Sequence, residues 1–157
     1  MKEEFGDIWQ LRSKLKADAV VITTNGFVKK NGEAVMGRGI ALEAAKKYKD
    51  FPARLGNVIT QFGNIVWPHE FDMWNGEADY QDLLITMPVK HNWWEKADIA
   101  LIKESTQNLT WMADDLGIKT ILVPRPGCGN GGLKWVDVKP IIEPYLDDRF
   151  VICHKES

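Results

Sequence analysis

The feature that most constrains the fold is the segment 18–24, Asp-Ala-Val-Val-Ile-Thr-Thr, in which an uninterrupted run of apolar and β-branched residues follows Asp18. β-Branched residues favour strands, and a run without polar alternation is typical of a strand that is covered on both faces. The run ends at Asn25-Gly26, which is a turn signal. The sequence therefore predicts a buried central strand that needs other elements packed on each side of it.

The rest of the chain alternates between strand and helix character. Further strands are predicted at 82–89, 119–124 and 149–154. Helices are predicted at 40–48, 98–116 and 136–146. The helix at 98–116 has Asp98 as an N-cap and stops at Gly117, and its apolar residues recur at helical spacing. This alternation predicts an α/β domain with three layers, α/β/α, around a mixed, largely parallel central sheet.

Two short segments, 57–60 and 64–67, flank Phe62-Gly63. Their β-branched residues and the intervening glycine predict that they pair as a hairpin.

Composition narrows the class of protein. The chain of 157 residues is 45% hydrophobic, which fits a single domain over 1–157 and excludes a disordered chain. Its apolar runs are far shorter than the ~20 residues of a membrane span, so no membrane contact is expected. Residues 1–5 lack the apolar segment of a signal peptide, and we expect a cytoplasmic, monomeric protein.

Charge and cysteine content exclude other classes. The formal net charge of −2 gives no general attraction for nucleic acid, although a local basic patch is compatible with it. The two cysteines, Cys128 and Cys153, have no metal-ligand spacing, so we expect neither a metal nor another cofactor.

Two glycine-rich loops follow predicted buried strands and open helices. The first is Met-Gly-Arg-Gly-Ile at 36–40, and the second is Pro-Gly-Cys-Gly-Asn-Gly-Gly-Leu at 126–133. In an α/β sheet, ligands bind at the carboxyl ends of strands, where such loops lie. Glycine lets backbone N–H groups approach an anion, and a helix N-terminus adds its dipole. Two such loops on one crevice predict an extended anionic ligand such as a diphosphate.

Two common nucleotide-binding motifs do not fit these loops. A Rossmann fingerprint places G-x-G-x-x-G directly after the first strand, but Gly37 and Gly39 come late and Leu42 occupies the third glycine position. A P-loop requires G-K-[ST], which occurs nowhere in the chain.

Several of these segments together resemble the macrodomain family, which binds ADP-ribose. Gly-Asp-Ile at 6–8 resembles an early family segment, and 18–25 is similar to the family strand that ends in asparagine. The segments 35–42 and 127–135 resemble the two ligand loops of one branch. That branch includes hydrolases that remove ADP-ribose from DNA bases or protein carboxylates, and relatives that dephosphorylate ADP-ribose-1''-phosphate.

The resemblance implies a function and a set of site residues. It implies ADP-ribose binding and hydrolysis at the distal ribose of an ADP-ribosylated small molecule, DNA or protein. Lys90 takes the catalytic position near the anomeric carbon, Asn25 orients a ribose hydroxyl, and Asp7 accepts from the adenine amino group. The implied ligand-binding residues are Asp7, Ile8, Thr24, Met36, Gly37, Arg38, Gly39, Ile40, Pro126, Gly127, Cys128, Gly129, Asn130, Gly131, Gly132 and Leu133.

The chain departs from the branch in two places. Residues 28–34 form an insertion in the first loop, which we interpret as a lid or as a determinant of the substrate. Gly131 stands where the carboxylate hydrolases have an aspartate, which favours DNA-linked ADP-ribose or ADP-ribose-1''-phosphate. Two other functions stay open: a module that binds ADP-ribose without turnover, and a binder of another nucleotide or of nucleic acid through Lys29-Lys30.

Overall fold

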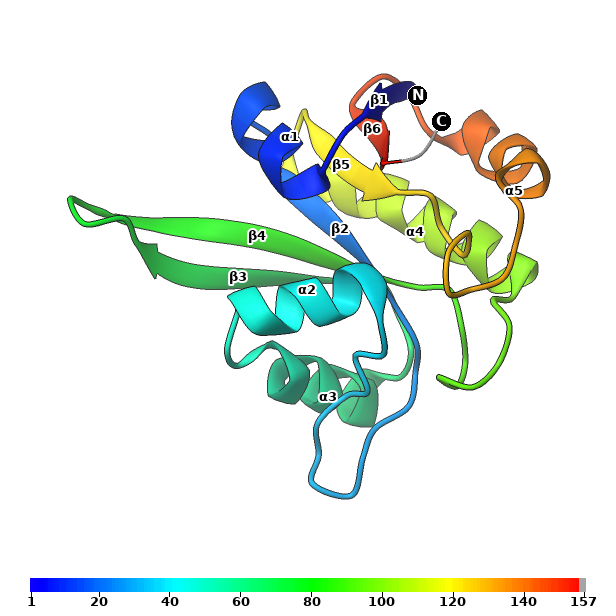
Figure 1. The fold of residues 1–157 in the computed structure, drawn as a ribbon, viewed down its shortest axis with the longest axis horizontal. Coiled ribbons are helices and arrows are strands. Elements are labelled where there is room, and N and C mark those ends of the chain that lie inside the picture. Colours follow the sequence, from blue (N-terminus) through cyan, green and yellow to red (C-terminus); the bar gives the residue numbers. More distant parts are fainter. Residues whose placement is uncertain (156–157) are drawn as a thin grey trace.

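The computed structural model describes residues 1–155 and contains one six-stranded sheet flanked by helices (Figure 1). The strands are β1 (Lys2–Phe5), β2 (Ala19–Thr24), β3 (Trp67–Trp74), β4 (Asp79–Pro88), β5 (Ile121–Pro124) and β6 (Phe150–His154). The helices are α1 (Ile8–Leu15), α2 (Gly39–Lys47), α3 (Phe51–Phe62), α4 (Ile99–Leu116) and α5 (Trp135–Ile142), followed by the short 3₁₀ helix η1 (Glu143–Tyr145).

The sheet has the order β1-β6-β5-β2-β4-β3, in which every neighbouring pair is parallel except β3 and β4. The predicted strands at 18–24, 82–89, 119–124 and 149–154 are β2, β4, β5 and β6. The expectation of a mixed, largely parallel sheet is therefore confirmed.

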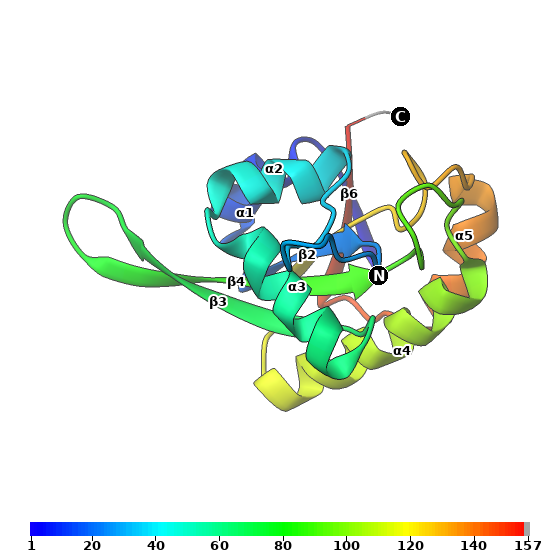
Figure 2. The ribbon, with the colours of Figure 1, turned by 90° about the horizontal axis from the view of Figure 1, so that it is seen from below.

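Helices cover both faces of the sheet, so the predicted three-layer arrangement is also confirmed (Figures 1 and 2). On one face, Val20, Ile22 and Leu122 pack against α1, α2 and α3. On the other face, Val21 and Ile121 pack against α4 and α5. Because consecutive residues of β2 enter opposite cores, the strand needs apolar side chains at nearly every position.

Helix α4 has the ends that its sequence predicts. The Asp98 side chain accepts hydrogen bonds from the N–H groups of Ala100 and Leu101, at 2.9 and 3.4 Å. Gly117 ends the helix with φ 65°, in the left-handed region that glycine adopts without steric cost. Of the helices within residues 1–155, none is both long and apolar enough to cross a membrane.

The predicted hairpin around Phe62-Gly63 is wrong, because residues 51–62 form helix α3. Pro52 lies in the first turn, where a missing N–H costs nothing, and Gly63 ends the helix with φ 94°. Phe51, Leu55 and Val58 are buried at helical spacing against the sheet. Burial of this stripe outweighs the weak strand preference of the short β-branched segment.

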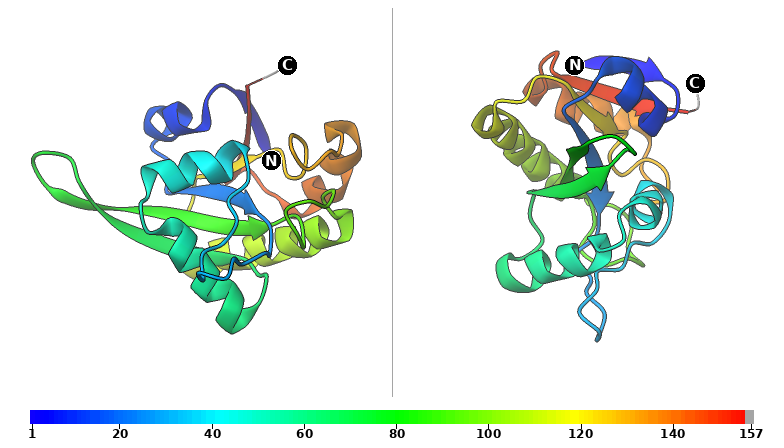
Figure 3. Two further views of the ribbon diagram at one scale, coloured as in Figure 1. Left: turned by 60° about the horizontal axis from the view of Figure 1, so that its bottom comes forward. Right: turned by 90° about the vertical axis from the view of Figure 1, so that its left-hand side faces the viewer.

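A long antiparallel hairpin formed by β3 and β4 was not predicted. It projects beyond the helices (Figures 1 and 3), and its distal half is exposed, with Trp74 at 63% and Tyr80 at 40%. The edge strand β1 was not predicted because all of it is exposed and lacks a buried pattern. Helix α1 was also missed, although Asp7 caps it and Ile8, Trp9 and Leu11 are buried.

Strands β2 and β5 pair only at their beginnings. Their register consists of Ala19 with Ile121 and Val20 with Leu122, whereas β2 pairs with β4 as far as Thr24. Beyond Val20 the two central strands therefore no longer form a ladder, and space opens between their carboxyl ends.

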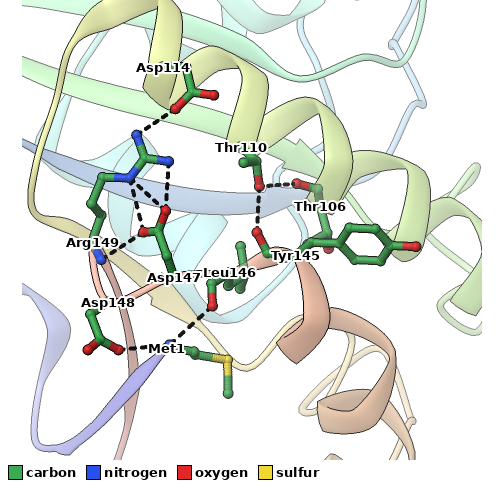
Figure 4. Close-up of polar contacts among 9 residues, drawn as sticks. All are labelled: Met1, Thr106, Thr110, Asp114, Tyr145, Leu146, Asp147, Asp148 and Arg149. Carbon is green, nitrogen blue, oxygen red and sulfur yellow. Dashed lines mark hydrogen bonds and ion pairs between the residues drawn. The ribbon is translucent and has the colours of Figure 1, made fainter.

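Polar contacts at the far end of the sheet fix the turn that leads into β6 (Figure 4). Arg149 pairs with Asp147 at 2.9 Å and with Asp114 of α4 at 2.8 Å. The hydroxyl of Thr110 donates to the carbonyl of Tyr145 at 3.1 Å. The amino group of Met1 donates to Leu146 and Asp148, which brings β1 against the same turn.

Candidate functional site

A cavity of about 420 Å³ lies at the carboxyl ends of the central strands. It is bounded by the segments that follow β2, β4 and β5. The lining residues are Thr23, Thr24, Asn25, Met36, Gly37, Arg38, Gly39, Ile40, Ala41, Val89, Lys90, Trp93, Pro124, Arg125, Gly127, Cys128, Gly129, Asn130 and Gly131. Both predicted glycine loops therefore meet at one cavity.

The second glycine loop is a closed turn that has no room for side chains at two positions. Gly127 has φ 72°, and a Cβ there would lie 2.7 Å from Ile102 Cδ1. A Cβ at Gly131 would lie 2.4 Å from the carbonyl oxygen of Gly127. That same carbonyl accepts the N–H of Leu133 at 2.9 Å, which closes the turn. The loop thus holds its backbone around the cavity in a form that requires glycine.

The first glycine loop brings the start of helix α2 to the opposite side of the cavity. Gly37 and Gly39 have φ 63° and 65°, and α2 begins at Gly39. The first N–H groups of a helix have no partner within it, so those near Ile40 are available to an anion. A Cβ at Gly39 would lie 3.3 Å from Asn130 Nδ2, which shows that the two loops face each other closely.

Asn25 is buried, and its amide is held by the loop that it starts. Its Nδ2 donates to the carbonyl of Val35 at 2.9 Å, and its Oδ1 accepts the N–H of Phe27 at 2.9 Å. An amide has two N–H donors and an oxygen with two acceptor sites, so these contacts use half of its capacity. The turn-forming role and a ligand-orienting role are compatible at this residue.

Lys90 connects two walls of the cavity. It follows β4, and its Nζ donates to the carbonyl of Asn130 at 3.1 Å and to that of Trp93 at 3.4 Å. A backbone bond from Ala97 N–H to Gly131 O, at 2.9 Å, joins the same two segments. The amine is thus placed by the second glycine loop rather than left free at a strand end.

The charged side chains that line the cavity are all cationic: Arg38, Lys90 and Arg125. No carboxylate is among the lining residues, all of which lie within the described range 1–155. Sequence reasoning missed Arg125, whose guanidinium lies over the Trp135 ring at 5.0 Å. Its place directly after a predicted buried strand was the signal that would have found it.

Cys128 lines the cavity as a protonated thiol. Burial raises its pKa to about 11, and its Sγ lies 3.4 Å from the carbonyl of Pro126. Since the thiolate is the nucleophilic form, the thiol fills space in the loop, as its lack of a nearby activating histidine predicts.

Some of the predicted ligand-binding residues lie outside the cavity lining: Asp7, Ile8, Pro126, Gly132 and Leu133. Asp7 caps helix α1 by accepting the N–H of Trp9 at 3.0 Å, and it pairs with Lys155 at 3.2 Å. Burial alone would raise the pKa of Asp7, but these contacts hold it below its usual value. Its contact with adenine stays a prediction.

The insertion at 28–34 is a short hairpin that rests on α3. Val28 and Ala34 form an antiparallel bridge, and Ala34 N–H donates to the carbonyl of Pro52 at 2.9 Å. Gly56 of α3 packs so closely that a Cβ there would meet the carbonyl oxygen of Gly32 at 1.9 Å. The hairpin therefore lies against α3 through Gly32 and Ala34, none of its residues lines the cavity, and it projects from the molecule (Figure 3).

Comparison with known proteins agrees with this architecture. Residues 70–142 match the family model of the Macro domain. The six-stranded sheet and its two helical layers are shared with solved macrodomains over nearly the whole chain, and the chain has the macrodomain fold.

Two solved structures and one curated relative illustrate what the chain is similar to. The macrodomain of Thermus aquaticus DarG superposes with a TM-score of 0.77 at 21% identity, covering 99% of this chain and 97% of that one. Thermosipho africanus DarTG in complex with ADP-ribose gives 0.74 at 21% identity, covering 98% and 41%. The DNA ADP-ribosyl glycohydrolase of Mycobacterium tuberculosis is 30% identical over 109 residues, which are 69% of this chain and 31% of the relative. The chain thus spans about a third of the length of the curated relative.

Proposed function

We propose that this macrodomain binds ADP-ribose and hydrolyses the bond that links ADP-ribose to DNA. The observation that carries the proposal is a cavity between two glycine loops, lined by cations and free of carboxylates within the described residues. A relative of this chain is named a DNA ADP-ribosyl glycohydrolase, and a structure of the same fold is solved with ADP-ribose.

The diphosphate of ADP-ribose fits the polar character of the cavity. The turn at 127–131 and the start of α2 present backbone N–H groups from opposite sides. Arg38 and Arg125 add positive charge around them, which favours a dianion in a partly desolvated site.

The distal ribose is assigned to the end of the cavity that holds Asn25 and Lys90. The amide of Asn25 has one donor and one acceptor site left for a ribose hydroxyl. Lys90 is the residue proposed to act at the anomeric carbon, as a nucleophile or base, because no carboxylate of the described chain lines the cavity. In the overall reaction, a water oxygen replaces the DNA atom on that carbon, and the DNA atom takes a proton.

Gly131 supports DNA over a protein carboxylate as the substrate. The resemblance places an aspartate at this position in carboxylate hydrolases, but here even a Cβ would lie 2.4 Å from Gly127 O. The turn must therefore differ in shape from one that carries an aspartate. The same argument does not exclude ADP-ribose-1''-phosphate, which carries neither protein nor DNA, so this compound is tested as the second substrate.

The experiment measures binding and turnover separately. Calorimetry with ADP-ribose, AMP and ATP should give micromolar affinity for ADP-ribose and much weaker binding of the controls. Turnover is then assayed on an ADP-ribosylated oligonucleotide, on ADP-ribose-1''-phosphate and on a protein with ADP-ribosylated glutamate. We expect the oligonucleotide to be cleaved fastest.

Lys90→Ala should abolish turnover while ADP-ribose affinity stays within about tenfold, since backbone N–H groups supply much of the binding. Lys90→Arg is the matched control because it retains the positive charge without the primary amine. Equal activity in Lys90→Ala would remove Lys90 from the mechanism. Tight ADP-ribose binding by a wild-type protein that cleaves none of the three substrates would identify a binding-only module instead.

A further inference from the structure

Three aromatic side chains form a cluster at the cavity, which we call the aromatic rim: the exposed Trp93, which lines the cavity, the exposed Trp94, and the half-buried Phe27. The rings of Trp93 and Trp94 meet edge to face at 5.5 Å, and those of Phe27 and Trp94 at 5.4 Å. Trp93 is 51% exposed and Trp94 is 60% exposed, although large aromatic side chains are normally well buried.

The rim is held in place by the same segment that carries Lys90. The carbonyl of Trp93 accepts from Lys90 Nζ at 3.4 Å, and Asn92 Nδ2 donates to Glu95 Oε1 at 2.6 Å across the turn. The carbonyl of His91 accepts the N–H of Gly26, which ties the segment to the first loop. The rings are therefore presented to solvent by a fixed backbone, immediately beside the residue proposed to act at the distal ribose.

We propose that the aromatic rim binds bases of single-stranded DNA next to the ADP-ribosylated nucleotide. This inference rests on the proposed function and adds to it the part of the substrate beyond ADP-ribose. An exposed aromatic face stacks on any base, which holds a strand without reading its sequence. Bases inside a duplex are already stacked on each other, so the rim favours a single strand.

The charge around the rim is compatible with a nucleic-acid backbone. Lys30 at the tip of the 28–34 hairpin and Lys96 after the rim are both exposed. The nearby carboxylates each have a partner: Glu33 pairs with Lys29 at 3.5 Å, Glu95 accepts from Asn92 at 2.6 Å, and Asp98 contacts His91 at 2.8 Å. Over 27–34 and 90–98 together there are four lysines and three carboxylates, so the segments that carry the rim do not share the net negative charge of −2 of the whole chain.

The test uses Trp94, which does not line the cavity, so that ADP-ribose binding and rim binding can be separated. For Trp94→Ala, kcat/KM on an ADP-ribosylated single-stranded oligonucleotide should fall about tenfold, mainly through KM. The calorimetric Kd for free ADP-ribose should stay within about twofold. Trp94→Phe should restore most of the loss because a stacking face is present again.

Trp111→Ala is the matched control. Trp111 is 77% exposed on α4 and lies 12 residues after its first residue Ile99, about 18 Å along the helix axis from the end nearest the cavity. Its removal should change neither measurement. In the wild type, hybridising the oligonucleotide to its complement should lower kcat/KM about tenfold or more.

Different outcomes separate this inference from the proposed function. If the wild type cleaves the oligonucleotide and Trp94→Ala cleaves it equally well, the rim does not bind DNA. If Trp94→Ala weakens free ADP-ribose as much as the oligonucleotide, the rim belongs to the ADP-ribose site and the inference is overturned. If the wild type cleaves only the ADP-ribosylated protein or ADP-ribose-1''-phosphate, the DNA assignment fails, and the inference fails with it.

Discussion

Replacing Gly131 by alanine should destabilise the protein because the second glycine loop closes on itself at this residue. The added Cβ would lie 2.4 Å from the carbonyl oxygen and 2.7 Å from the carbonyl carbon of Gly127, whereas real Cβ contacts are essentially never closer than 3.0 Å. The Gly127 peptide has to retreat, but a shift of Gly127 is resisted by Ile102, Ala97 and Leu133 packed around it.

The size of the effect follows from these contacts. Forced repacking of a tight site costs about 1–3 kcal/mol. The bond from Leu133 N–H to Gly127 O, now 2.9 Å, is lost or weakened, which costs about 1 kcal/mol more. Alanine restricts the unfolded chain and returns about 0.4–1 kcal/mol. We expect a net loss of about 2 kcal/mol, equivalent to about 4–8 °C in Tm for a chain of this length.

Urea unfolding followed by tryptophan fluorescence measures this loss, and Gly129→Ala is the matched control in the same loop. A Cβ at Gly129 meets nothing within 4 Å, and Gly129 is not among the positive-φ glycines. Gly129→Ala should therefore unfold at the wild-type urea concentration or slightly above it. If the two variants unfold at the same midpoint, the loop does not close on Gly127 in solution and the reasoning is refuted.

Two further predictions concern buried polar groups. Burial, with a smaller effect of Arg54, lowers the pKa of His69 to about 4, so below pH 6.5 the unfolded chain binds a proton that the folded chain does not. The free energy of unfolding should thus fall by about 2 kcal/mol between pH 7.5 and 5, and His69→Gln should remove this part of the pH dependence in urea titrations; an unchanged slope would contradict it. The hydroxyl of Tyr48 donates to Asp82 at 2.7 Å and accepts from Arg12 at 2.7 Å, so Tyr48→Phe should cost about 1–2 kcal/mol in the same assay. If Tyr48→Phe lowers the free energy of unfolding no more than a Tyr→Phe substitution at an exposed position does, these hydrogen bonds do not stabilise the fold.

The parts of the fold that the sequence predicts are those specified by local signals. The strand β2 is identified by six consecutive residues of apolar or β-branched type, and α4 by Asp98 at its start and Gly117 at its end. These signals act within the segment itself, so they need no knowledge of its neighbours.

The predictions of secondary structure fail where tertiary contacts, and not local sequence, determine the conformation. Residues 57–62 have weak strand preference, but Val58 reaches the core only when the segment is helical, together with Phe51 and Leu55. The distal half of the β3–β4 hairpin is exposed and has no buried pattern to recognise. In this half, β3 and β4 are strands because they pair with each other and not because they are buried.

The site follows the same division. The two glycine loops are visible in the sequence because the backbone geometry of Gly127 and Gly131 excludes side chains. Thr23 and Arg125 line the cavity because β2 and β5 both end there. Composition does not reveal where two strands end relative to each other. The placement of Lys90 by Asn130 depends on two loops that are 40 residues apart and meet only in the folded chain.

The early end of pairing between β2 and β5 has a thermodynamic consequence. After Val20 and Leu122 the centre of the sheet gives up ladder bonds that a continuously paired sheet would keep, and Thr24 and Pro124 border the cavity instead. The sheet therefore has a gap in its ladder at its middle, between strands that are otherwise largely buried, and a bound ligand supplies contacts there that the chain itself omits. A ligand at 100 times its Kd would raise the free energy of unfolding by about 2.7 kcal/mol. When the ligand binds, backbone amide hydrogen exchange should therefore slow most in the central strands. The ligand then stabilises the fold as well as being the substrate.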